Sequence, residues 1–196
     1  MKQSKRFEEA VTAIDEANRK DPNREKADGR EIAKELLYSE RMTEWLKRMA
    51  PDAAEELRLA ARAQHIERWV IPREEYPMDR RGYKQWRNKL MEYHAGRTEE
   101  ILREAGYDDK AIERVRKLVM KKGIKTDPEV QLLEDVICLV FLDYYFDEFA
   151  REHNDEKLVS ILQKTWAKMS EQGRKMAQTI EISPNAERLI GKALAG

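Results

Sequence analysis

Hydrophobic positions recur along most of this chain with the spacing of α-helices. Phe7, Val11 and Ile14 lie on one stripe, which predicts an amphipathic helix over residues 3–19. A polar loop is expected over 21–29. Comparable stripes predict further helices over about 30–49, 51–69, 80–104 and 108–122, and from about 154 and 183 onward.

Residues typical of helix ends bound several of these segments. Asp79 and Asp108 are good N-cap residues, and Ser183 with Pro184 is a typical helix start. Gly106 and Gly123 are typical of positions just beyond a helix. No alternating pattern is long enough to predict more than a few residues of strand. We therefore expect an all-α fold.

The longest apolar run lies at 126–150, TDPEVQLLEDVICLVFLDYYFDEFA. A helix that is apolar on all sides is buried on all sides, so this segment is predicted to form the centre of the fold. Thr126 is its expected N-cap, with Glu129 completing a capping box. Glu134, Asp135 and Asp143 interrupt the run. A buried carboxylate is costly unless it is paired, hydrogen-bonded or metal-bound, so these acids are expected to have partners.

Length and charge limit the classes of protein that fit. The 196 residues suit one domain, predicted to comprise an N-terminal helix and loop (1–29), a helical core (30–170) and a C-terminal helical extension (171–196). Lys+Arg and Asp+Glu are equal at 38 each, so no net field attracts nucleic acid or an anionic membrane. Cys138 is the only cysteine, which excludes a disulfide within the chain. The first residues carry no apolar signal region and the apolar run holds acids, so no membrane partner and a cytoplasmic location are expected.

The three histidines differ in their surroundings. His153 lies near a predicted helix end, where the helix dipole accounts for it. His65, in AARAQHIERW, and His94, on a long helix, are predicted to be buried. Either each is a core histidine bonded to a neighbour, or both combine with Glu134 and Asp135 in one polar site. Such a set suits acid–base chemistry or zinc, iron or manganese, but without a local HExxH or CxxC motif it would be assembled only by tertiary folding.

Arginine and aromatic residues alternate in the segment 68–87, RWVIPREEYPMDRRGYKQWR. Pro72 and Pro77 prevent a regular helix through its first half. The arginine fork suits phosphate or carboxylate, and aromatic faces suit a base or ring. The segment is either a loop pinned to the surface by its aromatics, with its arginines paired to acids, or a lid over a pocket for a small anionic ligand.

Four segments resemble a known family. Over almost its whole length the chain resembles the family of domain of unknown function 4202. The segments that carry this resemblance are ELLYSERMTEWL, LRLAARAQHIERW, IPREEYPMDRRGYKQWR and LLEDVICLVFLDYYF. That resemblance implies no activity.

A more distant resemblance is to helices of the HD superfamily of metal-dependent phosphohydrolases. It rests on the segments LRLAARAQHI, YSERM and LEDVICLVFL. The resemblance implies an HD-like core over 30–170, with the segment 68–87 over a central pocket. In this register Tyr38 replaces the first histidine and Gln64-His65 replaces the His-Asp pair, whereas Asp135 keeps its type.

Three functions remain open. The first is a hydrolase or related enzyme acting on a small phosphorylated or nucleotide-like substrate. His65, His94, Glu134 and Asp135 would be catalytic, or would bind a divalent metal (manganese, iron or zinc); without metal, His65 held by Asp135 would be the general base. The predicted substrate-binding residues are Tyr38, Gln64, Arg68, Trp69, Arg73, Tyr76, Arg80, Arg81, Tyr83, Trp86 and Arg87. The second is a non-catalytic ligand-binding or regulatory module on a degenerate HD-like scaffold, and the third is RNA association through the segment 68–87.

Overall fold

A computed structural model describes residues 4–27 and 29–195 of the chain. The chain divides into two compact units, residues 1–122 and 123–196. The prediction of an all-α fold is confirmed, because the described residues are mostly helical and hold one small sheet of two strands. That residues 1–196 form a single domain stays a prediction. No helix in the described ranges is long and apolar enough to span a membrane.

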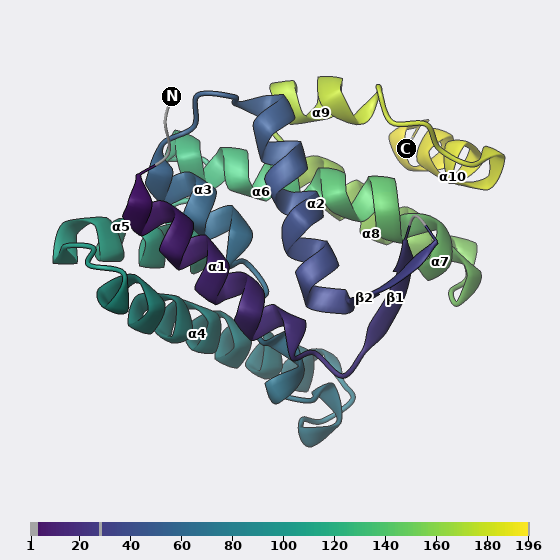
Figure 1. Cartoon of the computed structure of the whole chain (residues 1–196). Helices are drawn as coiled ribbons and strands as arrows, with labels where there is room; N and C mark the ends of the chain where they lie inside the picture. Colours follow the sequence, from purple (N-terminus) through teal and green to yellow (C-terminus); the bar gives the residue numbers. More distant parts are fainter. Residues whose placement is uncertain (1–3, 28, 196) are drawn as a thin grey trace. The chain divides into compact units, whose positions relative to one another are not determined.

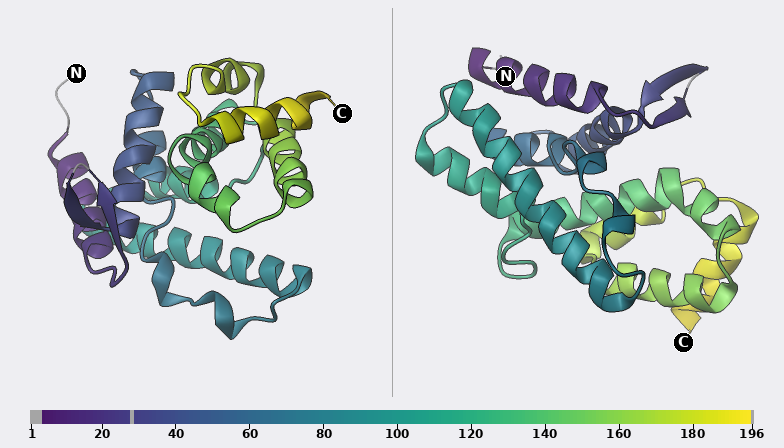
Figure 2. Two further views of the ribbon diagram at one scale, coloured as in Figure 1. Left: turned by 90° about the vertical axis from the view of Figure 1, so that its right-hand side faces the viewer. Right: turned by 90° about the horizontal axis from the view of Figure 1, so that it is seen from below.

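The first unit is a group of helices with one short hairpin (Figure 1). Its elements are α1 (Lys5–Arg19), β1 (Arg24–Ala27), β2 (Arg30–Ala33), α2 (Lys34–Met49), α3 (Glu55–Arg62), 3-10 turns at Arg68–Val70 and Arg73–Glu75, α4 (Arg80–Glu104) and α5 (Asp109–Val119). Helix α1 packs on α2, α3 and α4, while α5 packs on α3 and lies beside α4 (Figure 2).

Apolar side chains on facing stripes of these helices form the core of the first unit. Ile14 of α1, Trp45 of α2, Leu59 of α3 and Leu102 of α4 are at most 2% exposed. Burying side chains of this size stabilises the unit by about 1.5–3 kcal/mol each. The helical stripes read from the sequence therefore supply the core as predicted.

The predicted loop over 21–29 and the predicted helix start at Arg30 are wrong. Residues on either side of Gly29 pair as an antiparallel hairpin, in which Arg24 faces Ala33. The buried carboxylate of Asp21 accepts hydrogen bonds from the backbone N–H of Asn23 and of Glu35, at 2.9 and 3.1 Å. These bonds fix the base of the hairpin to the first turn of α2, so the helix begins at Lys34.

The third helix is shorter than the predicted 51–69. It begins at Glu55, because Ala54 is extended (ψ 151°), and it ends at Arg62. The following residues leave the helical path, and Glu67 adopts a left-handed conformation. His65 therefore lies in a turn and not on a helix.

Helix caps in the first unit agree with the sequence at most ends. Asp79 accepts from the N–H of Gly82 at 2.7 Å, and Asp108 accepts from the N–H of Ala111 at 2.8 Å. Gly106 follows α4 with a φ of 80°, as expected of a residue beyond a helix C-terminus. The helix predicted to reach residue 122 ends earlier, at Val119.

The second unit contains the apolar run and the helices after it. Its elements are α6 (Pro128–Val140), a π-helical turn (Phe141–Tyr145), α7 (Phe146–Arg151), α8 (Asp155–Lys168), α9 (Glu171–Ala177) and α10 (Pro184–Ala195). Val130, Leu133 and Leu139 are fully buried. The predicted N-cap Thr126 is wrong: Asp127 caps α6, its carboxylate accepting from the N–H groups of Glu129 and Val130.

Candidate functional site

A strained turn after α3 carries His65. Glu67, two residues later, has a φ of 51°, which is uncommon for a residue other than glycine. Its N–H donates to the side-chain oxygen of Asn18 at 2.9 Å. Its carboxylate accepts from the Tyr93 hydroxyl at 2.8 Å and from Arg97 Nε at 3.2 Å. Helices α1 and α4 therefore hold the turn from both sides and fix the direction of the side chains around it.

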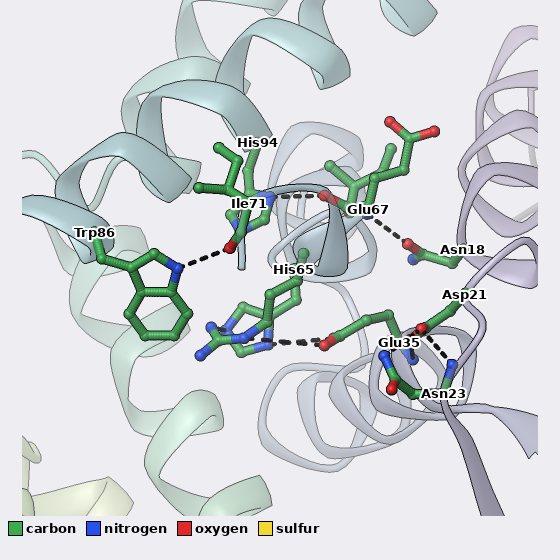
Figure 3. Close-up of polar contacts among 11 residues, drawn as sticks. Asn18, Asp21, Asn23, Glu35, His65, Glu67, Ile71, Trp86 and His94 are labelled. Carbon is green, nitrogen blue, oxygen red and sulfur yellow. Dashed lines mark hydrogen bonds and ion pairs between the residues drawn. The ribbon is translucent and has the colours of Figure 1, made fainter. Parts of the chain in front are cut away.

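His65 faces the carboxylate of Glu35 (Figure 3) and, on its other ring nitrogen, the guanidinium of Arg68. Its Nδ1 is 3.5 Å from a carboxylate oxygen of Glu35, and its Nε2 is 3.3 Å from Arg68 Nη1. Arginine can only donate, so Nε2 accepts and the ring proton is on Nδ1, facing Glu35. The ring of Tyr38 stacks on that of His65, with centroids 4.0 Å apart and planes at 12°. The side chain of His65 is 24% exposed, so part of it contacts solvent.

The environment shifts both titrating groups toward their neutral forms. Burial raises the pKa of Glu35 from its ordinary 4.5 to about 7, outweighing the opposite effect of the Arg68 charge. Burial, followed by the charge of Arg68, lowers the pKa of His65 well below 6.5. Near neutral pH the pair therefore comprises a neutral imidazole and a carboxyl group that can both take up and release a proton.

His94 on α4 is a second imidazole near the first. The two ring centroids are 6.0 Å apart, and Nδ1 of His94 donates to the backbone oxygen of Ile66 at 2.7 Å. Nε2 then carries the lone pair; it is buried and has no hydrogen-bond partner in the described part of the chain. Burial lowers the pKa of His94 to about 3, so this nitrogen remains an acceptor at neutral pH.

Cationic side chains surround the two imidazoles. The guanidinium of Arg68 lies 4.8 Å over the ring of Trp86, and Trp86 Nε1 donates to the backbone oxygen of Ile71 at 2.8 Å. The charges of Arg68, Arg87 and Lys121 each lower the pKa of His65. The first unit therefore gathers positive charge at a partly accessible histidine, and Glu35 is the carboxylate that lies against that ring.

The segment 68–87 is held in place by contacts of its own side chains, while a lid over an anion pocket stays a prediction. Arg73 donates to the backbone oxygens of Tyr76 and Pro77, at 2.9 and 2.8 Å, so it pins the loop. Arg68 reaches the histidine, whereas Arg80 and Arg81 are exposed and Tyr83 is 46% exposed. Trp69, Tyr76 and Arg87 are half-buried, and Trp86 is buried.

Gln64 precedes His65 and is almost completely buried. Its side-chain oxygen has no hydrogen-bond partner among the described residues, like Nε2 of His94. Tyr38, by contrast, has a defined place, because its ring supports one face of His65. Of the residues predicted to orient a ligand, Tyr38 thus contacts the histidine.

The predicted acids Glu134 and Asp135 belong to the second unit. Asp135 accepts from the N–H and hydroxyl of Ser170 at 2.8 and 2.5 Å, and from the Gln131 amide at 3.1 Å. Glu134 forms an ion pair with Lys168 at 3.5 Å. Asp135 therefore anchors the N-cap of α9 within its own unit. A site that joins these acids to the histidines stays a prediction, and within the described ranges no three His, Cys, Asp or Glu side chains are grouped to hold a metal.

Sequence reasoning missed Glu35, the carboxylate that lies against His65. A signal for it exists in the sequence. Glu35 precedes Tyr38 by three positions, and residues at that spacing share one face of a helix. An acid one turn before a residue that supports the histidine is a candidate partner for it.

The Asp135→Ala substitution is expected to lower the free energy of unfolding by about 2 kcal/mol, because it leaves the half-buried N–H and hydroxyl of Ser170 without their acceptor. Urea unfolding of Asp135→Ala, Ser170→Ala and the double variant measures the coupling between the two residues. Asp147→Ala is the control, because its contact with Ser183 is exposed. Additive losses from Asp135→Ala and Ser170→Ala would contradict the anchoring role.

Comparison with known families gives one match. The model of the family described as Domain of unknown function (DUF4202) matches residues 8–190, which is most of the chain. No curated protein and no solved structure matches the chain.

Proposed function

We propose that this chain, which belongs to the DUF4202 family, is a hydrolase that binds a small phosphorylated or nucleotide-like molecule beside His65. The observation that carries the proposal is the grouping of Glu35, His65 and Arg68, with neutral and cationic groups in contact. The distant resemblance to the HD phosphohydrolases favours the same class of substrate.

Positive charge around the histidine supports a phosphate-bearing ligand. The Arg68 guanidinium has a planar face on Trp86, which leaves its edge for a bidentate contact with phosphate oxygens. Arg87 and Lys121 add charge near the same ring. The hydrogen bond of Trp86 to Ile71 fixes the indole, so its role is to orient Arg68 and not to stack on a base.

The Glu35–His65 pair supplies proton transfer for hydrolysis. When Arg68 turns to the phosphate, Nε2 of His65 is released and can take a proton from the attacking water, while the Nδ1 proton moves toward Glu35. The water oxygen forms a bond to phosphorus as the bond to the leaving oxygen breaks. The leaving oxygen then receives the proton from His65. A Glu35 pKa of about 7 suits this exchange at neutral pH.

The residues of the first unit do not fit a divalent metal. Nε2 of His65 already faces the cationic Arg68, and the charges of Arg87 and Lys121 would repel a second cation. Three His, Cys, Asp or Glu side chains are not grouped anywhere in the described part of the chain. We therefore derive no step through a metal.

RNA association is the weaker alternative. Arg73 is bonded to backbone oxygens and Trp86 is buried, so neither offers a free surface to a nucleotide. Arg80 and Arg81 are exposed, but Glu74, Glu75 and Asp79 are exposed in the same segment. A mixed surface of this kind does not favour a polyanion.

Product release from a panel of phosphorylated metabolites and nucleotides tests the proposal. The full chain is expected to release product from at least one of them, and that compound is expected to raise the melting temperature. Arg87→Gln should weaken binding, whereas the matched variant Arg81→Gln, at an exposed arginine of the same helix, should not. A thermal shift without turnover would establish a non-catalytic ligand-binding module. Neither shift nor turnover with any compound would overturn the proposal.

A further inference from the structure

A polar cleft lies wholly within residues 123–196, in the C-terminal unit. Its volume is about 460 Å³, and its wall is formed by the turn before α6, the first turns of that helix, the end of α8 and the start of α9. The lining residues are Lys125, Thr126, Asp127, Pro128, Gln131, Ala167, Lys168, Met169, Ser170 and Arg174. It shares no residue with the Glu35–His65 site.

Three side chains in this cleft are cationic, and they differ in how far they are engaged. Lys125 has no ion-pair or hydrogen-bond partner for its side chain within the described ranges. Arg174 donates from Nε to the backbone oxygen of Trp166 at 3.0 Å, which leaves both terminal nitrogens of its fork unbonded among the described residues. Lys168 is held at 3.5 Å from Glu134.

The single acid in the lining, Asp127, is already engaged. Its carboxylate accepts from the N–H groups of Glu129 and Val130, so it neutralises the start of α6 and those amides are unavailable to a ligand. Asp135, behind the cleft, is occupied by Ser170. The attraction for an anion therefore comes from the side chains of Lys125, Lys168 and Arg174, and not from the helix end.

We propose that this cleft binds the phosphate groups of a small-molecule ligand, independently of the proposed hydrolase site. The Arg174 fork would make a bidentate contact with one phosphate, and the ammonium groups of Lys125 and Lys168 would contribute charge from the opposite segments. The Thr126 hydroxyl, which donates to the Gly123 oxygen at 3.0 Å, retains acceptor capacity only, so it does not compete for the anion. A cleft that is open to solvent and lined by two exposed lysines is suited to a reversibly bound effector.

Titration of inorganic pyrophosphate into the ¹⁵N-labelled full chain tests the proposal site by site. Amide signals of residues 125–131 and 167–174 are expected to shift with one saturating curve. Lys125→Gln is expected to raise the Kd of that curve about fivefold. Lys175→Gln removes the same charge from an exposed position of α9 outside the cleft, so it should leave the curve unchanged.

This experiment tests the proposal for the cleft separately from the proposal for the hydrolase site. Shifts confined to residues of the first unit would overturn the cleft proposal while leaving the hydrolase proposal standing. Shifts in the cleft that Lys125→Gln and Arg174→Gln both leave unchanged would also overturn it. Saturation of the cleft by a single-stranded oligonucleotide but not by pyrophosphate would show a nucleic-acid surface and contradict a small-molecule site.

Discussion

His65→Asn is expected to reduce kcat for hydrolysis about 10³-fold, with little change in KM. Asparagine keeps a polar side chain of similar reach, but it cannot accept a proton from water, and positioned acid–base groups contribute about 10²–10⁴-fold. Substrate affinity should persist because Arg68, Arg87 and Lys121 remain. Steady-state kinetics with the compound identified in the panel give both parameters.

His153→Asn is the matched control, because that histidine donates to the backbone oxygen of Phe149 at 3.0 Å within the second unit. It should retain the full rate. Circular dichroism and the melting temperature establish that each variant is folded. A His65→Asn protein that is folded and turns over substrate at the full rate would remove His65 from the mechanism. A large rise in KM with unchanged kcat would assign His65 to binding alone.

The second large effect concerns stability and pH. As pH rises from 5 to 8, Glu35→Gln is expected to become more stable relative to wild type by about 2.5 kcal/mol. This difference follows from a Glu35 pKa that is raised from 4.5 to about 7. A carboxyl with a raised folded-state pKa binds its proton more tightly when folded. Its contribution to stability is therefore complete below pH 4.5 and is lost as pH rises through about 7.

Titration of the buried His94 changes the free energy of unfolding in the opposite direction over part of this pH range. The pKa of His94 falls to about 3 on folding, so its contribution to stability is present above pH 6.5 and is lost as pH falls. The stability profile of wild type alone would mix these effects. The quantity to measure is therefore the difference between Glu35→Gln and wild type, from urea unfolding at several pH values. A difference that is constant with pH would mean that Glu35 titrates normally in the folded chain.

Helix positions follow from the sequence because spacing and end residues act locally. Asp79, Asp108 and Gly106 were predicted from their preferences alone and they bound helices in the structure. The absence of a polar face in the apolar run predicts one helix buried on all sides, and this is confirmed only in part. Leu133 and Leu139 of α6 are fully buried, but the helix is interrupted at Phe141–Tyr145, and Asp147 and Glu148 of α7 are exposed.

The errors arise where a distant contact overrides a local preference. Thr126 and Asp127 are both good caps, and the choice between them is made by the turn from Gly123, to whose oxygen Thr126 donates. The hairpin over 24–33 is short and charged, and its anchor Asp21 binds the N–H of Glu35, fourteen positions away. Neither contact produces a periodic pattern in the sequence from which it could be predicted.

The residues of the candidate site also differ in whether the sequence alone indicates them. His65 and His94 were singled out by residue type, and the first unit brings their rings to 6.0 Å. The sequence points to Glu134 and Asp135 of the apolar run as their carboxylate partners, because a buried acid is conspicuous there, and that grouping stays a prediction. Glu35 occupies a helix of mixed composition, where an acid attracts no notice until folding places it against the imidazole.

The left-handed turn at Glu67 has a consequence for ligand affinity. Backbone and side chain of this residue are each tied to a helix, so the backbone that carries His65 and Arg68 is fixed when the chain folds. Ordering on association otherwise costs about 0.5–1.5 kcal/mol for each immobilised side chain. A ligand arriving at this turn would order the Arg68 side chain but not the loop that carries it, so less of its binding free energy would be lost to ordering.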